Sequence, residues 1–169
     1  MLHATNESCF RMEESIKTGM AFGLTSGIIT TLGLIVGLHS GTHSGAVVIG
    51  GVITISVADA LSDALGIHVS EEAENTHTEK EVWISTLTTF LSKFICSLSF
   101  LVPLLLLKLQ TAIWVSVFWG LGLLAFLSFW IARSQRKRSF PIISEHLLVA
   151  IVVIAITHAL GDYVSTWTG

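Results

Sequence analysis

The sequence predicts an all-α polytopic membrane protein, a bundle of five transmembrane helices without a soluble domain of any size. Of its 169 residues, 51% are hydrophobic and 12% are charged, and the mean hydropathy of +0.74 lies outside the range of soluble globular domains. Five apolar runs are each about 20 residues long, enough for a helix to cross the hydrocarbon core. Because a chain this short cannot close a large barrel, helices are the structure that satisfies the backbone in lipid.

The five spans follow one another with short connections. Within one transmembrane domain over residues 1–169, we expect them at residues 18–38, 46–67, 83–107, 111–132 and 144–166. The first run is internal and follows the charged stretch from Arg11 to Lys17, so we expect a retained anchor and not a cleaved signal peptide. Pro103 is expected to kink or end the third helix. Only residues 108–110 separate the third span from the fourth, which predicts an antiparallel hairpin.

Basic residues in the loops predict a cytoplasmic amino terminus. This orientation leaves Lys108 as the one basic residue outside and places the others in the cytoplasm, namely Arg11, Lys17, Lys80 and the cluster at residues 133–138. The cluster is either the topology determinant alone or also a contact for anionic lipid headgroups. We expect a multi-pass protein of a prokaryotic cell membrane, surrounded by the lipid bilayer.

Glycines recur every fourth residue along the first span. They form two groups: Gly19, Gly23 and Gly27, then Gly33, Gly37 and Gly41 just beyond the span. Small residues at this spacing allow two helix backbones to approach closely within a membrane. The partner is either another helix of the same chain or the same helix of a second copy in a homodimer, and the spacing alone does not choose between them.

Two acids lie inside the second span. Asp59 and Asp63 are four residues apart, so they lie on one face of the helix, about one turn from each other. Ala58, Ser62 and Gly66 form a stripe of small residues beside them, where another helix can approach. A carboxylate near the bilayer centre costs at least about 2.5 to 3.5 kcal/mol, so both acids should face protein or water.

The acid pair has two interpretations. It is a structural hydrogen-bond or ion-pair group, with Lys93 of the third span as a partner, or it is a cation or proton site. Carboxylate oxygens suit hard or borderline divalent cations, and in a low-dielectric site two acids retain protons that an arriving cation displaces. The second interpretation therefore predicts that metal uptake releases protons.

Two further groups of polar residues are candidates for a role in ion movement. His158 and Asp162 are four residues apart in the last span and form either a proton relay or a hydrogen-bonded pair at a helix end. The segment after the second span is rich in acids, and its possible cytoplasmic metal-capture residues are His68, Glu71, Glu72 and Glu74. The alternative for this segment is a solvated acidic surface, because nothing in the sequence fixes a coordination geometry.

Motifs of other chemistries are missing from the sequence. It contains no phosphate-binding glycine loop followed by Lys and Ser or Thr, no HExxH and no nucleophile elbow. We therefore expect neither an enzyme nor a nucleic-acid-binding protein, and no resident cofactor.

Two segments resemble the vacuolar iron transporter family. They are FGLTSGIITTLGLIVGL at residues 22–38 and VVIGGVITISVADALSDALGIHVS at residues 47–70, which are similar to the family's first two spans. The family's first span carries Asn-Asp-Gly followed by Thr and a terminal Gly, and its second carries Ser-Met-x-x-Gly-Glu-Tyr-x-Ser. The stretches TTFLSKFICSLSFLVPLLLL and THALGDY extend the likeness more loosely over the remaining spans.

The resemblance implies a five-helix subunit that forms a homodimer. It also implies proton-coupled antiport of Fe²⁺ or Mn²⁺ along a path between the subunits, lined by the first two helices. The family's first-span aspartate falls on Ser26 and its second-span methionine on Asp63, while its glutamate and tyrosine fall on Ile67 and His68. Three positions match the family motif: Ser62, Gly66 and Ser70. The chain lacks the family's long cytoplasmic metal-binding helices, so it resembles a short member without that domain.

Together, the residues and the resemblance predict a homodimeric transporter of a divalent metal, iron or manganese, coupled to protons. Asp59 and Asp63 of both subunits would form its site, assisted by the oxygens of Thr25, Ser26, Thr30 and Ser62. Such an all-oxygen site should discriminate less among manganese, iron and magnesium than the family's mixed carboxylate and thioether site. The alternative is a non-transporting membrane protein whose buried acids are structural or bind a partner chain. Export of a small organic cation is a third possibility.

Overall fold

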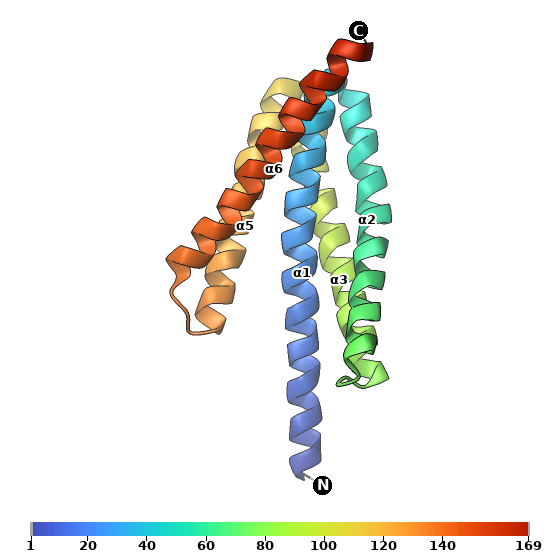
Figure 1. Cartoon of the computed structure of the whole chain (residues 1–169), viewed down its shortest axis with the longest axis vertical. Helices are drawn as coiled ribbons and strands as arrows, with labels where there is room; N and C mark the ends of the chain where they lie inside the picture. Colours follow the sequence, from blue (N-terminus) through green and yellow to red (C-terminus); the bar gives the residue numbers. More distant parts are fainter. Residues whose placement is uncertain (1, 169) are drawn as a thin grey trace.

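The structure, a computed structural model that describes residues 2–168, is a bundle of long helices (Figure 1). They are α1 (Leu2–Thr42), α2 (Gly45–Glu74), α3 (Glu79–Ser99), α4 (Leu101–Leu106), α5 (Leu109–Ser134) and α6 (Ser139–Thr168). Within the described range, five helical segments are long and apolar enough to cross a membrane, and α3 with α4 forms one of them. The all-α fold class with five spans is thus confirmed. The side of the membrane on which the chain begins stays a prediction from the basic residues.

Local sequence explains where the helices start and stop. Ser44 caps α2 by accepting a hydrogen bond from the N–H of Val47, and Thr78 and Glu81 form a capping box at the start of α3. Pro103 has no N–H to donate to the carbonyl four residues back, and its ring clashes with that carbonyl. The third span is accordingly interrupted between α3 and α4, just before the proline.

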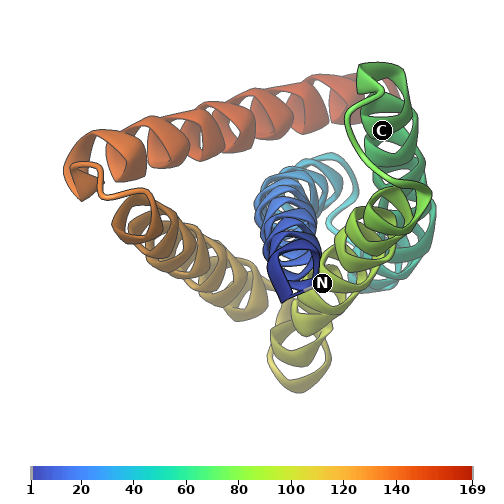
Figure 2. The same cartoon turned by 90° about the horizontal axis from the view of Figure 1, so that it is seen from below.

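α1 runs through the middle of the bundle and contacts every other long helix. Viewed along the bundle, α2 and α3 lie on one side of α1, and α5 and α6 lie on the other (Figure 2). In Figure 1, the α5–α6 hairpin leans away from α1 at the end that carries the N terminus, and α6 crosses α1 near the opposite end. The apolar core surrounds the second half of α1, and its fully buried members include Leu32, Ile35, Val52, Phe100 and Leu124.

The glycines of α1 lie against two other helices of the same chain. A Cβ added at Gly19 would be 2.5 Å from the Ser85 carbonyl oxygen of α3, and one added at Gly37 would be 3.2 Å from the Thr157 carbonyl oxygen of α6. Gly23 and Gly27 also face α3, whereas Gly33 and Gly41 face α6. Of the two partners that the spacing allowed, the one seen for these glycines is intramolecular.

A second row of small residues lies on the outer side of α2. Its members recur every four residues, and all of them are exposed: Gly50, Thr54, Ala58, Ser62, Gly66 and Ser70. A Cβ added at Gly50 or Gly66 would meet nothing within 4 Å. We call these six residues the small-residue face of α2, because a further helix can approach the backbone closely there.

Adding one methyl group to the α1–α3 contact should destabilise the protein. In Gly19→Ala the new Cβ must push the α3 backbone away. In Gly66→Ala it enters open space, and alanine is favoured over glycine inside a helix by about 1 kcal/mol. The thermal unfolding midpoint in detergent should therefore fall for Gly19→Ala and stay or rise for Gly66→Ala. Equal midpoints for the two variants would contradict this packing.

Candidate cation-binding site

Five polar side chains line one face of α3. Every fourth residue is polar and at most 4% exposed: Glu81, Ser85, Thr89, Lys93 and Ser97. Residues four apart share a helix face, and the first glycine group of α1 lies against this one. We call the five residues the polar stripe. Only Lys93 among them was expected to take part in the site, although their four-residue period is visible in the sequence.

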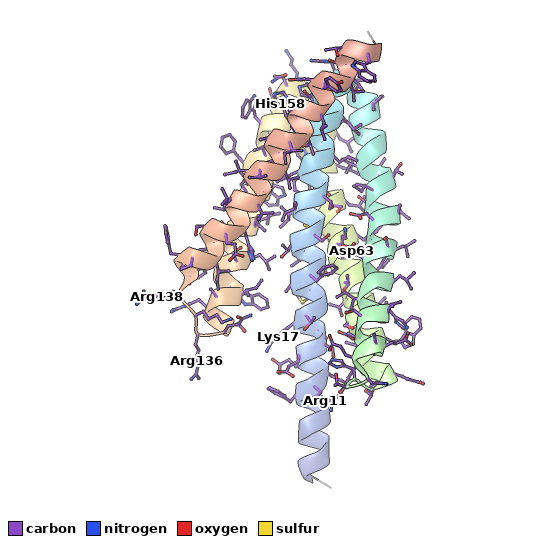
Figure 3. All side chains as sticks on the ribbon, viewed as in Figure 1. Arg11, Lys17, Asp63, Arg136, Arg138 and His158 are labelled. Carbon is purple, nitrogen blue, oxygen red and sulfur yellow. The ribbon has the colours of Figure 1, made fainter. Side chains whose placement is uncertain are left out.

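Lys93 is the centre of the candidate site. Its ammonium nitrogen Nζ lies 2.5 Å from Asp59 Oδ2 and 2.5 Å from Asp63 Oδ2, and it donates a 2.9 Å hydrogen bond to Ser26 Oγ. Ser26 Oγ in turn donates to Asp63 Oδ2 at 2.6 Å. The cluster therefore joins α3 to both α2 and α1, and Figure 3 shows Asp63 midway along the bundle among these helices.

The two acids are held differently. Asp63 accepts hydrogen bonds from Lys93 and Ser26, whereas Asp59 Oδ2 has the ion pair with Lys93 but no hydrogen-bond partner. The side chains of Asp59 and Asp63 are 27% and 20% exposed, against 1% for Lys93. Asp59 is therefore the more exposed acid and has fewer hydrogen bonds. Two ionised carboxylates beside one ammonium would leave a negative charge in excess.

The surrounding sequence makes room for a buried lysine. A Cβ added at Gly27 would lie 3.2 Å from Lys93 Cγ, so the glycine leaves the space through which the methylene stem passes. The stem is buried between α1 and α3 while the ammonium reaches the acids of α2, as amphipathic side chains do. Asp59 lies near the middle of the 30-residue α2. The charged groups are thus far from either helix end.

The oxygen donors predicted on the first two helices are only partly brought together. Ser26 is in the cluster, but Thr30 donates to the Ser26 carbonyl oxygen of its own helix at 2.9 Å. In the part of the chain that the structure describes, neither Thr25 nor Ser62 donates to the acids. Ser62 and Asp59 instead line a groove of about 690 Å³ between α1 and α2. This groove borders the small-residue face of α2.

The predicted metal-capture residues near the end of α2 point in different directions. Glu71 is 7% exposed and accepts a 2.5 Å hydrogen bond from Ser85 of the polar stripe. Glu74 and Glu71 line a cavity of about 680 Å³ between α1, α2 and α5. His68 Nε2 and Glu72 Oε1 are 3.5 Å apart and line a different pocket. The structure therefore divides the four residues into two pairs.

The predicted relay residues lie far from the acid pair. His158 Nδ1 and Asp162 Oδ1 are 3.8 Å apart on α6, and both contact the Ser40 hydroxyl of α1. Ser26 and Ser40 are about 21 Å apart along α1, at about 1.5 Å per residue. Figure 3 accordingly shows His158 near one end of the bundle and Asp63 near the middle.

An ion pair that the sequence analysis missed anchors the start of the polar stripe. Arg11 Nε lies 3.0 Å from Glu81 Oε1, and Glu81 Oε2 also accepts a 2.8 Å hydrogen bond from the Thr78 N–H. Arg11 was expected only to set the orientation in the membrane. It also joins α1 to α3 at the end of the bundle where α3 begins.

The arrangement binds a positive charge in the middle of the bundle, and in this conformation the charge belongs to Lys93. Among the side chains that the structure describes, those of residues 10–167, no group of three or more His, Cys, Asp or Glu is placed to hold a metal ion. One chain thus supplies two carboxylates and one hydroxyl, which hold a single cationic group. These oxygens are of the type that hard divalent cations prefer.

Charge balance, more than any single contact, should set the stability of this cluster. Asp59→Asn/Asp63→Asn leaves Lys93 buried without a counter-charge, which should lower the free energy of unfolding by about 3 kcal/mol. Adding Lys93→Met to the double variant removes the orphaned charge and should restore most of the loss. Thermal unfolding in detergent measures both steps. A triple variant no more stable than the double variant would show that the ammonium is not the source of the loss.

One family of known proteins matches part of this chain. Residues 19–84 match the model of the VIT family, and this segment holds most of α1, all of α2 and both acids. Neither the curated proteins nor the solved structures gave a match. The VIT family is a family of transporters, so the match supports a membrane metal-ion transporter in general. The predicted resemblance is therefore confirmed, and this five-span membrane protein is similar to the VIT family over residues 19–84.

Proposed function

We propose that this protein carries divalent metal cations across a membrane, with Fe²⁺ and Mn²⁺ as substrates and protons as counter-ions. The observation that carries the proposal is the pair of carboxylates in the middle of α2, which keep a positive charge in the centre of the bundle. A site that binds an ammonium there has the charge and the oxygen ligands that hard and borderline divalent cations require. The family match over residues 19–84 supports the same class of function.

In the proposed mechanism, Asp59 and Asp63 bind the metal after they release the Lys93 ammonium. Ser26 Oγ remains beside Asp63 as a further oxygen ligand. A carboxylate oxygen that holds a proton cannot bind the metal at the same time. Metal and protons therefore compete for the same oxygens, and this competition couples their movement in opposite directions.

A homodimer would complete the ligand set. One chain offers two carboxylates, whereas the small-residue face of α2 is uncovered and borders the groove that Asp59 lines. Two copies packed through this face about a twofold axis would bring both Asp59 side chains near the axis. The proposed site then has four carboxylates, supplied by Asp59 and Asp63 of each copy.

The proposed path runs from one end of the bundle to the other. We place the amino terminus in the cytoplasm, so that the cavity lined by Glu71 and Glu74 opens to that side. Glu14 also lines the cavity, and these three acids outnumber Lys17 of the same lining, so the net negative potential attracts cations. At the far end, His158 and Asp162 would exchange protons with the external solution in this proposal.

A structural role is the second candidate function, favoured by the close contacts of Lys93 with both acids. In that case the carboxylates neutralise the lysine permanently, and the protein holds a partner or stabilises an assembly without transport. This candidate predicts that neutralising the acids lowers thermal stability and leaves any response to metal unchanged.

Metal flux into proteoliposomes tests the transport proposal. With Mn²⁺ supplied on one side and a pH gradient imposed, the wild-type protein should take up metal and release protons. Asp59→Asn/Asp63→Asn should abolish the flux, because asparagine supplies no negative charge. The exposed Glu79→Gln serves as a matched control that removes an acid away from the site. Equal flux through the double variant and the wild type would eliminate this mechanism.

Crosslinking in native membranes tests the proposed dimer. In a Cys9→Ser background, Gly66→Cys places a thiol on the small-residue face and should form a disulfide between two copies. Leu87→Cys places one on the exposed side of α3 and should remain monomeric. Crosslinking at position 87 but not at position 66 would assign the dimer to another face.

A further inference from the structure

We infer that Lys93 is a tethered counter-cation, whose ammonium occupies the site of Asp59 and Asp63 when no metal is bound and must leave before a divalent cation can bind. This inference rests on the proposed transport function and assigns the regulation of that site to one residue. Its starting observation is that Lys93 uses the oxygens that the metal would need, on Asp59, Asp63 and Ser26.

Lys93 and a metal ion cannot share these oxygens. Nζ lies 2.5 Å from one oxygen of each carboxylate, which leaves no room for a second cation between them. With both acids ionised, the cluster has one excess negative charge while the ammonium is in place and two when it is withdrawn. The Coulomb attraction for an arriving cation grows with that charge and is strong in a poorly solvated site. The resting position of Lys93 therefore lowers the affinity for metal.

The polar stripe contains an acceptor for the displaced ammonium. Thr89 lies one turn before Lys93 on α3, is fully buried, and its hydroxyl oxygen has no hydrogen-bond partner. Long side chains in a helix lean back over the preceding turn, so rotation of the stem takes the ammonium from α2 toward Thr89. Gly27 leaves space beside the stem for this movement. An unsatisfied buried hydroxyl thereby gains a donor when the metal arrives.

A tethered monovalent cation also selects among visiting ions. Sodium or potassium would replace one positive charge by another and gain no net attraction from the exchange. A divalent cation brings a second charge and matches both carboxylates. Lys93 should therefore suppress binding of monovalent cations, although it lowers the affinity for divalent ones as well.

Binding of Mn²⁺ to the purified full-length chain in detergent, measured by isothermal titration calorimetry at one fixed pH, tests the inference. Lys93→Met should bind Mn²⁺ at least about tenfold more tightly than the wild type, because the competing charge is gone. Lys93→Arg keeps the charge and should bind no more tightly than the wild type. Sodium chloride should weaken Mn²⁺ binding to Lys93→Met more than choline chloride at the same ionic strength, and the two salts should act equally on the wild type.

Thr89→Val provides a second test that leaves the lysine in place. It removes the acceptor for the displaced ammonium and should weaken Mn²⁺ binding. Thr88→Val is its matched control, because the Thr88 hydroxyl donates to the Ile84 carbonyl oxygen of its own helix at 2.6 Å. Equal affinity in these two variants would overturn the inference, and this comparison decides the matter if Lys93→Met does not fold.

The outcomes separate this inference from the proposed function. If Lys93→Met binds Mn²⁺ no more tightly than the wild type while Asp59→Asn/Asp63→Asn loses binding, the lysine does not compete and only the inference fails. If the double variant binds Mn²⁺ as well as the wild type does, the acids are not the site and the proposed function fails with it.

Discussion

A lysine ammonium in the middle of a membrane bundle is the constraint on which the rest of this structure depends. An unpaired charge at that depth costs at least about 2.5 to 3.5 kcal/mol, so Lys93 requires carboxylates within reach. Asp59 and Asp63 meet this requirement because they lie one turn apart on α2, where one nitrogen contacts an oxygen of each. The same constraint accounts for the first glycine group of α1. These glycines let α1 lie close to α3, so that Ser26 of α1 can accept a hydrogen bond from Lys93 of α3.

The contacts that stabilise the bundle are the same contacts that the proposed transport would have to break. A permanently closed cluster would favour rigidity, whereas one in which two carboxylates share a single ammonium remains able to attract a cation. The groove beside Asp59 gives such a cation a route of approach from the side of α2 that no other part of the described chain covers.

Much of the fold could be predicted from the sequence, and the limits have physical causes. Apolar runs of membrane length predicted the five spans, and the spacing of the acids predicted their common face. The glycine spacing predicted a close approach but not its partner, because a helical period defines a face and says nothing of which helix packs on it. Glu71 and Glu72 were grouped by their place in the chain, yet adjacent helical residues point about 100° apart and so face different pockets. Lys93 was expected as an ion-pair partner in only one of the two interpretations of the acid pair.

The polar stripe also determines how α3 is turned about its own axis. The side that faces away from α1 is apolar along its length, with Leu87, Leu91 and Ile95 exposed, and lipid does not distinguish one such side chain from another. Advancing the helix by one residue, about 100° of rotation, would carry the ammonium of Lys93 from its acids toward the acyl chains. A uniformly apolar helix could settle at several azimuths, but this one has a single orientation compatible with the bilayer, and that orientation places the lysine opposite α2.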